Sequence, residues 1–459
     1  MSSNTGRTTA AIRALGLIVI ALHLLAPLFE ERHVWGLWPA TYLPPGWRWG
    51  GAALAATLVL IGPSRLRRPL RAIPLDSHVW RAVLALASAA PFVVWRIRHL
   101  RWGDAYILAN SIPHPEVQLT YTWQAPLDVF VHAKLWAAGH RLLGWADAVP
   151  AYTVLSSLAG VAFVWILLGF AVWLGRGRAE TLLTVGLVGT LGVMQLFFGY
   201  IENYSLMTVG VLAYLWLALR TLKGEIPLWA PATVLAATHA FHPSTIILAP
   251  TLLWVAWRSS RRESGRPVRR PWARWLVEIA LPYAAVLGGV IALMTAGGHG
   301  LEALTGVDAP GGGDRSWFVP LRQVSTRWEH YTLFSWGHLV DIVNQQLLVA
   351  PVIWPSLLLC FAGARHRIPW RDPGFIFLGL SSVLYLLLTL TWNPDYGGQR
   401  DWDLFAPAAV PAAMWLVYTL PRTLSVPEDW RAAGWSLVSA QAFHTAAWIY
   451  QNTRPWSWS

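Results

Sequence analysis

Apolar runs of about 20 residues recur from one end of this sequence to the other, and this recurrence restricts the fold more than any other feature. A helix of that length crosses the hydrocarbon core of a bilayer. Only 13% of the residues are charged and 55% are hydrophobic, whereas about a quarter of a soluble domain is charged. Because backbone polar groups in lipid must be satisfied within their own segment, the runs predict an all-α polytopic membrane protein.

The first of these runs, 10–29, has the length of a signal peptide but a different end. It leads into the charged segment 30–33 without the small residues of a cleavage site, so we expect a retained helix. The single cysteine, Cys360, excludes an internal disulfide. Tryptophan is abundant, with 31 residues, which suits indole rings that anchor helices in the headgroup zone.

The basic residues are concentrated in short segments between the apolar runs, and the net charge is +12. A basic chain can bind nucleic acid, but this placement is the positive-inside pattern of membrane topology. We therefore exclude nucleic acid as a partner. The basic segments contain Arg65, Arg67, Arg68 and Arg71; Arg176 and Arg178; Lys223; the cluster 258–274; Arg365, Arg367 and Arg371; and Arg422 and Arg431.

The positive-inside rule also decides how ambiguous runs are counted. Placing every basic segment in the cytoplasm requires an even number of crossings between each pair. The short run 49–62 must then be a span, because otherwise the next basic segment would lie outside. The long run 228–257 must be two spans broken at Pro243, since proline removes a backbone donor and ends a helix.

The result is about thirteen spans in a multi-pass protein of the cell (plasma) membrane, with a cytoplasmic amino terminus and an outer carboxyl terminus. Two additional spans within 1–78 precede a core of 79–459, and the core has long outer loops at 96–150 and 297–338. The spans are expected near 10–29, 49–62, 79–95, 152–174, 180–199, 204–222, 228–241, 243–257, 275–296, 339–362, 374–392, 403–421 and 431–450.

The first outer loop contains an apolar stripe at helical spacing. This pattern predicts an interfacial helix that lies along the membrane. Three polar residues, Asp128, His132 and His140, fall off the stripe. The stripe consists of Leu127, Phe130, Val131, Leu135, Ala138 and Leu142.

Polar residues at the ends of apolar spans cost free energy, and this makes them candidates for function. Asp104 follows the span 79–95, Glu202 lies in a tight turn, and two histidines flank the break at Pro243. The densest cluster is the segment 393–403. All of these groups fall on the predicted outer side, which indicates one outer-facing site. The remaining candidates are His239, His242, Tyr396, Arg400, Asp401 and Asp403.

Each candidate also has a purely structural interpretation. Asp403 can cap the helix that begins at Leu404, and Arg400 can pair with Asp401 or Asp395. The histidines can be satisfied core residues, Glu202 can hydrogen-bond within its turn, and Asp104 can be a solvated loop acid. The sequence has no His/Cys cluster with the spacing of a structural zinc site, and no phosphate loop of a nucleotide hydrolase.

These positions resemble the GT-C class of membrane glycosyltransferases, which includes the protein O-mannosyltransferases and the lipid A aminoarabinose transferases. The resemblance rests on the span 79–95, the pair Gly103-Asp104, Pro126-Leu127 at the start of the interfacial helix, and Glu202. Many members have a second acid next to the first and a Pro-Pro pair. Here Ala105 follows Asp104, and Gln124-Ala125-Pro126 takes the place of Pro-Pro.

The resemblance implies transfer of a sugar from a polyprenyl-phosphate donor to a glycan, lipid or protein acceptor at the outer face, with inversion at the anomeric carbon. Asp104 would be the base, and Glu202 would assist it or share a divalent cation, Mg²⁺ or Mn²⁺, with it. Arg400 is the leading partner of the donor phosphate, because guanidinium grips phosphate oxygens by a fork of donors. Arg315 and Arg322 are alternatives. The candidate substrate-binding residues are His239, His242, Tyr396, Asp401, Asp403 and Trp102.

Three other functions remain open at this point. A transporter or flippase of lipid-linked saccharides also needs membrane-embedded charges and broken helices, but here the polar groups gather on one face. A saccharide ligase or polymerase would use a related pyrophosphate donor. A structural membrane subunit would have no use for the outer acids.

Overall fold

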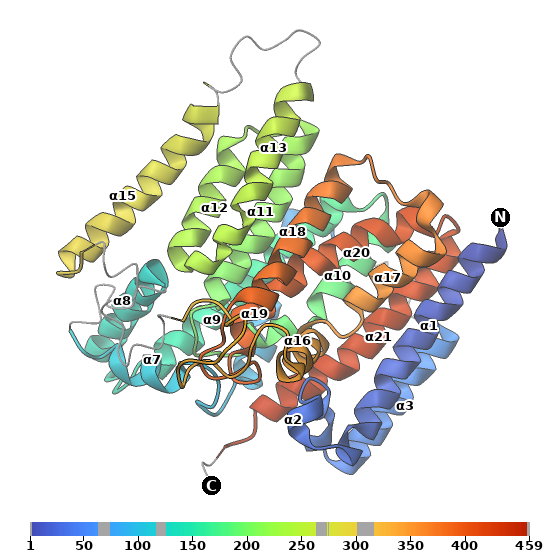
Figure 1. The fold of residues 1–459 in the computed structure, drawn as a ribbon, viewed down its shortest axis with the longest axis horizontal. Helices are drawn as coiled ribbons and strands as arrows, with labels where there is room; N and C mark the ends of the chain where they lie inside the picture. The colour runs from blue at the N-terminus through green and yellow to red at the C-terminus, as the bar shows by residue number, and fades with distance from the viewer. Residues whose placement is uncertain are drawn as a thin grey trace.

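The computed structural model describes residues 2–62, 74–115, 125–262, 273, 275–300 and 316–456. Within these ranges the regular structure is helical, and an isolated β-bridge joins Phe318 to Trp392 (Figure 1). The predicted all-α class is therefore confirmed. The amino terminus and the carboxyl terminus lie at opposite ends of the bundle (Figure 1). We call the end that carries α2, α7, α16 and the carboxyl terminus the site end.

Six of the described helices are long and apolar enough to cross a membrane, or seven if a bent pair counts as one span. The chain is thus a multi-pass membrane protein, whereas the expected count of about thirteen spans is not confirmed by this criterion. The six segments are Thr5–Leu28, Val149–Leu174, Ser205–Lys223, Leu276–Ala296, Pro373–Thr391 and Trp402–Thr423.

Several other expected spans are helices that are short or interrupted. The expected span at 79–95 is split into α5 (His78–Ala87) and α6 (Ala89–Val94). In the one at 180–199, the α-helix α10 (Arg178–Gly189) ends early, and the chain continues as the 3₁₀ helix η3 (Gly192–Phe197). Interrupted helices of this kind are tolerated where neighbouring helices satisfy the freed backbone groups.

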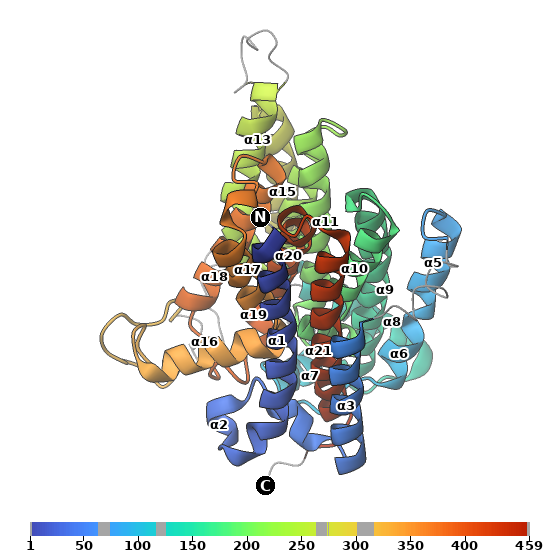
Figure 2. The same cartoon turned by 90° about the vertical axis from the view of Figure 1, so that its right-hand side faces the viewer.

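The expectation of a single continuous span at 339–362 is wrong. It consists of α16 (Trp336–Val349) and α17 (Ile353–Gly363), which meet at an angle of 94°, so that α16 lies crosswise to the long helices (Figure 2). Pro351 explains the break, because the residue before a proline is disfavoured in the α conformation. That residue is Ala350, whose backbone is at φ −159° and ψ 61°.

The expected break at Pro243 is confirmed. Helix α12 (Trp229–Phe241) ends at His242, whose backbone is extended, and the chain then continues as η4 (Pro243–Leu248) and α13 (Ala249–Arg262). Both α12 and α13 pack against α11 (Ser205–Lys223). Helix α15 (Leu281–Ala296), preceded by the π-helical turn η5 (Leu276–Ala280), packs mainly against α12.

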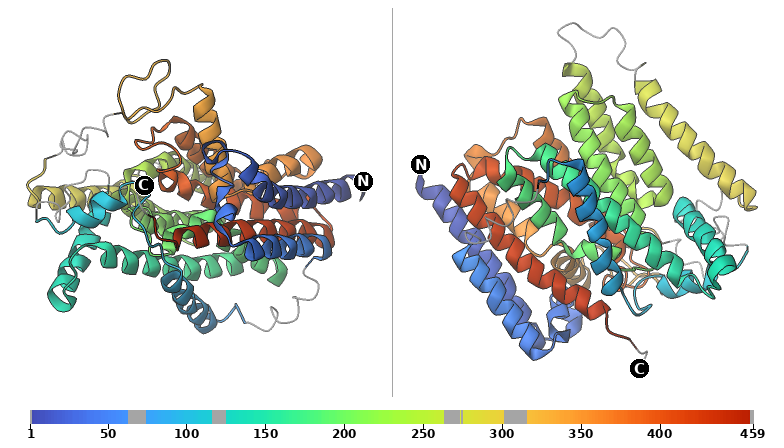
Figure 3. Two further views of the ribbon diagram at one scale, coloured as in Figure 1. Left: turned by 90° about the horizontal axis from the view of Figure 1, so that it is seen from below. Right: turned by 180° about the vertical axis from the view of Figure 1, so that it is seen from behind.

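The two amino-terminal helices are packed against the carboxyl-terminal helix. Helices α1 (Ser2–Leu25) and α3 (Pro45–Ile61) lie beside α21 (Pro427–Asn452) (Figure 3). The connection between them, at the site end, contains the 3₁₀ turn η1 (Ala26–Leu28), α2 (Glu31–Val34) and the 3₁₀ helix η2 (Trp38–Tyr42). The first helices and the last helix of the chain are therefore packed side by side.

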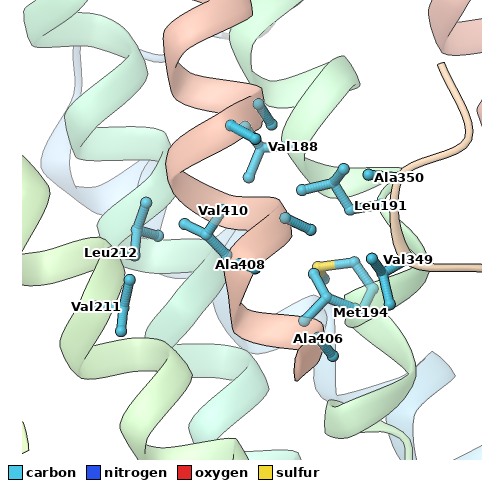
Figure 4. Close-up of a cluster of buried hydrophobic side chains, with 14 of the residues drawn as sticks. Val188, Leu191, Met194, Val211, Leu212, Val349, Ala350, Ala406, Ala408 and Val410 are labelled. Carbon is cyan, nitrogen blue, oxygen red and sulfur yellow. The ribbon is translucent and has the colours of Figure 1, made fainter. Parts of the chain in front are cut away.

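The centre of the bundle is the segment of α19 (Trp402–Phe405), η9 (Ala406–Ala408) and α20 (Ala409–Thr423). Almost every side chain of α20 is buried, because α20 packs against α10, α17, α18 (Pro373–Thr391) and α11. Figure 4 shows this packing around Val188, Leu212 and Val410. The acids at the start of this segment are consequently held near the middle of the site end.

The predicted helix in the first outer loop is present as α8 (Pro126–Leu143). Its buried face carries Asp128, His132 and Trp136, whereas Leu142 in the apolar stripe is 77% exposed. The physical reason is that lipid takes the place of water around a membrane protein. Apolar side chains turn outward to lipid, and charged side chains turn inward to the protein.

Candidate functional site

The turn before α7 (Ala105–Ser111) brings Asp104 against the start of the central segment. Gly103 has a left-handed backbone, with φ +45°, and its N–H donates to the carbonyl of Arg400 over 2.9 Å. A Cβ at Gly103 would collide with the Glu202 carboxylate and would lie 3.2 Å from Oδ2 of Asp403. Glycine is therefore required by both the turn and the close approach of two acids.

Four carboxylic acids from three parts of the chain meet here, and we call Asp104, Glu202, Asp401 and Asp403 the acid cluster. Glu202, in the turn before α11, accepts a hydrogen bond from the backbone N–H of Asp104. Asp403 accepts from the Tyr200 hydroxyl over 2.9 Å and from the N–H of its neighbour Leu404, also over 2.9 Å. Sequence reasoning did not single out Tyr200, although this residue belongs to the same turn as Glu202.

The loop 393–403 closes over Asp104. The hydroxyl of Tyr396 donates to Oδ1 of Asp104 over 2.8 Å. The backbone N–H of Tyr396 donates to Oδ2 of Asp401 over 2.7 Å. The guanidinium of Arg400 lies over the Tyr396 ring, 4.8 Å from its centroid. Tyr396 thus stands between the candidate base and the candidate phosphate partner.

Burial and the nearby carboxylates raise the pKa values of Glu202 and Asp401. The pKa of Glu202 is raised well above its ordinary value, first by burial and then by the nearby carboxylates of Asp403 and Asp104. The pKa of Asp401 is raised well above its usual range by burial and then by Asp403. Burial and Asp403 also raise the pKa of the Tyr200 hydroxyl. A bound proton or cation would relieve this repulsion.

A cation site is not assembled among these acids. Among the described residues, no group of three or more His, Cys, Asp or Glu side chains is placed to hold a metal ion. Asp104 and Glu202 meet through a backbone N–H of Asp104. A divalent cation at these two carboxylates would therefore need further ligands, which a substrate phosphate can supply.

No protein-family model and no curated protein sequence matches this chain. Among solved structures, ArnT from Cupriavidus metallidurans, crystallised with undecaprenyl phosphate, superimposes with a TM-score of 0.50 over 82% of this chain and 77% of that one. The chain shares the ArnT fold. This match confirms the expected GT-C-like architecture. At 10% sequence identity the likeness concerns the fold alone.

Within this ArnT-like fold, the two candidate histidines make contacts of their own. His242 packs against the ring of Tyr204, 4.9 Å between centroids, and its Nδ1 bonds the Ser244 hydroxyl over 2.8 Å. His239 bonds the Thr245 hydroxyl over 2.7 Å and the Tyr283 hydroxyl of α15 over 3.0 Å. In the part of the chain that is described, no hydrogen bond joins either histidine to an acid of the cluster.

Trp102 differs from its expected place on the substrate. Its side chain is 1% exposed, and its indole N–H donates to Asn452 over 2.6 Å. It also packs against Trp448. In this conformation Trp102 holds the turn of Asp104 against α21, and a sugar could not stack on it.

Of the two alternative arginines, the structure describes Arg322 and not Arg315. Arg315 lies outside the described residues. Arg322 is exposed in the loop before α16, and over the ranges that the structure describes it forms no hydrogen bond or ion pair with the cluster. Arg400 is the candidate phosphate partner whose backbone carbonyl accepts from Gly103, the neighbour of Asp104.

A second buried polar group lies behind the cluster. Nδ1 of His132 is 2.9 Å from Oδ2 of Asp128, and both side chains are buried. The His132 ring stacks on Tyr152 at 3.8 Å, and the Tyr152 hydroxyl donates to the side chain of Asn203 over 3.3 Å. Asn203 is the neighbour of Glu202. The sequence contained a signal for this pair, since residues four apart share one face of a helix.

Proposed function

We propose that this chain is an integral membrane glycosyltransferase that transfers a sugar from a polyprenyl-phosphate donor to an acceptor hydroxyl at the site end. The observation that carries the proposal is the meeting of Asp104, Glu202 and Asp403, from three distant segments, in a chain with the ArnT fold. The crystal structure of ArnT contains undecaprenyl phosphate, which supports the donor class. The positive-inside pattern supports an outward-facing site end.

In this proposal Asp104 is the general base. Its carboxylate takes the proton of the acceptor hydroxyl while that oxygen forms a bond to the anomeric carbon. The bond between the anomeric carbon and the phosphate oxygen breaks, and polyprenyl phosphate leaves with the bonding electrons. One displacement of this kind inverts the anomeric carbon. The hydrogen bond from Tyr396 would fix the orientation of the base.

Arg400 would stabilise the departing phosphate, because a guanidinium near the reacting centre offsets negative charge as it develops. Its guanidinium lies against Tyr396, which contacts Asp104. A protonated Glu202, or a divalent cation shared by Glu202 and Asp104, would remove repulsion between the acid cluster and the donor. The raised pKa of Glu202 supports the first of these.

The test is sugar transfer by the purified protein, using polyprenyl-phosphate sugars and a panel of glycan, lipid and protein acceptors. Asp104→Asn should abolish transfer while the protein stays folded. Asp147→Asn is the matched control, because Asp147 lies in the same loop and caps α9 (Val149–Leu174) through a hydrogen bond that asparagine also accepts.

Full activity of Asp104→Asn would remove this residue as the base. Movement of a labelled lipid across liposomes without chemical change, in the absence of any transfer, would refute the transferase and favour a flippase.

A further inference from the structure

A single carboxylate at the site end joins three segments that are far apart in the sequence. Asp341, in α16, accepts the indole N–H of Trp35 at Oδ1 over 3.0 Å. Its Oδ2 accepts the backbone N–H of Gly398 over 3.2 Å. The Tyr331 hydroxyl, from the loop before α16, also bonds this carboxylate. The amino-terminal connection and the loop 393–403 are thus held by one side chain.

Further polar contacts surround Asp341. The N–H of Gly36 donates to Oδ1 of Asn344 over 2.9 Å, and Nδ2 of Asn344 donates to the carbonyl of His33 over 2.9 Å. Gln399 donates to Glu31 over 2.9 Å. The connection between α1 and α3 therefore binds both α16 and the loop. The bond from Gln399 goes to a carboxylate, and hydrogen bonds to charged groups are stronger than neutral ones.

The same loop carries the groups that contact the candidate base. Tyr396 is two residues before Gly398 and donates to Asp104. The carbonyl of Arg400, two residues after Gly398, accepts from Gly103. A Cβ at Gly398 would lie 2.8 Å from Oδ2 of Asp341, so the loop approaches the carboxylate as closely as glycine allows.

We propose that Asp341 is a positioning residue, which together with Trp35 fixes the loop 393–403 so that Tyr396 orients Asp104. The inference rests on the proposed glycosyltransferase function. It gives the amino-terminal helices a part in positioning the base, because the connection between them supplies the indole N–H of Trp35. Asp341 touches no reacting atom and acts through the loop. Small misplacements of a catalytic group are known to cost large factors in rate.

Two variants test the proposal without removing a residue of the acid cluster. Trp35→Phe deletes the indole N–H and keeps an aromatic ring. Asp341→Asn keeps the shape but replaces one accepting oxygen with an NH2 donor, so one of the two hydrogen bonds is lost and the other is weakened. Trp47→Phe is the control, since Trp47 lies nearby in sequence and is 74% exposed. Hydrogen exchange of the peptide that covers 393–403 reports on the loop, and initial rates of sugar transfer report on kcat and KM.

In both variants we expect faster exchange of the loop peptide and a kcat lower by about tenfold, with KM for the donor within about twofold. The control should match the wild type in both measurements. If either variant fails to fold, the other still decides the outcome.

Unchanged loop exchange in both variants would overturn the inference, as would a lower Tm with unchanged kcat, which is the signature of a structural role. If the variants exchange faster in the loop but the wild type transfers no sugar, the dependence of the loop on Asp341 is distinguished from the proposed function. The loop would then depend on Asp341, while the proposed function, and with it the positioning role, would fail.

Discussion

At the scale of single residues, the turn of Gly103 combines a left-handed backbone with direct contact to two acids. Gly103→Ala should abolish sugar transfer, because its Cβ would displace Glu202. Gly144→Ala is a matched control, since Gly144 is also left-handed, with φ +70°, but has open space around it. The backbone alone should cost each variant about 1–2 kcal/mol of stability. Equal activity of the two variants would contradict the role of the close approach.

The raised pKa of Glu202 predicts that KM for the donor depends on pH. Its pKa is raised, first by burial and then by Asp403 and Asp104. The carboxyl therefore stays protonated above its ordinary range and ionises only as the pH rises through the raised pKa. Ionisation adds negative charge beside the donor phosphate, so KM for the donor should increase with pH. Initial rates at several pH values measure this effect. Glu202→Gln should show a flat KM, and a wild-type KM that decreases with pH would contradict the prediction.

The gathering of Asp104, Glu202 and the loop 393–403 at one end was predictable, because topology parity placed all three on one side of the membrane. Their contacts were not. The hydrogen bond between Asp104 and Glu202 joins residues 98 positions apart, and no local pattern specifies such a pairing. The roles of Tyr200 and Asp341 depend in the same way on long-range packing.

At the scale of helices, α8 contains a buried pair, Asp128 and His132. Asp128→Ala would remove the acid while Nδ1 of His132 keeps its bond to the backbone carbonyl of residue 128, and loss of a buried polar partner costs about 1–3 kcal/mol. A marked decrease in the Tm of the purified protein should follow. His140→Ala, on an exposed position of the same helix, should leave the Tm almost unchanged. Similar Tm values for both variants would show that the pair contributes little.

Two prolines, Pro243 and Pro351, show which helix breaks can be predicted from the sequence and which cannot. The break at Pro243 was required by the count of basic segments on either side. The bend at Pro351 was missed because the apolar run continues through it, and because one span or one bent pair satisfies the same parity. The face of α8 that packs on the protein, with Asp128 and His132, was not predicted. An apolar stripe marks the buried face only where the surroundings are water.

At the scale of the whole molecule, the topology can be tested with two single cysteines. Cys360 is buried, so Cys360→Ser gives a background without thiols. Both Ser325, in the loop before α16, and Ser425, between α20 and α21, are exposed. In intact cells a membrane-impermeant maleimide should label Ser325→Cys and leave Ser425→Cys unlabelled. The reverse labelling would show that the protein has the opposite orientation in the membrane.

The central position of α20 has a consequence for how the protein is made. This helix is surrounded by α10, α11, α17 and α18, which all precede it in the sequence and have entered the membrane before α20 is synthesised. Its own insertion then occurs into protein surroundings more than into lipid. Asp401 and Asp403, which lead into it, are among the last site residues to reach the membrane. A chain interrupted before residue 393 would therefore carry Asp104 and Glu202 without the groups that complete their surroundings.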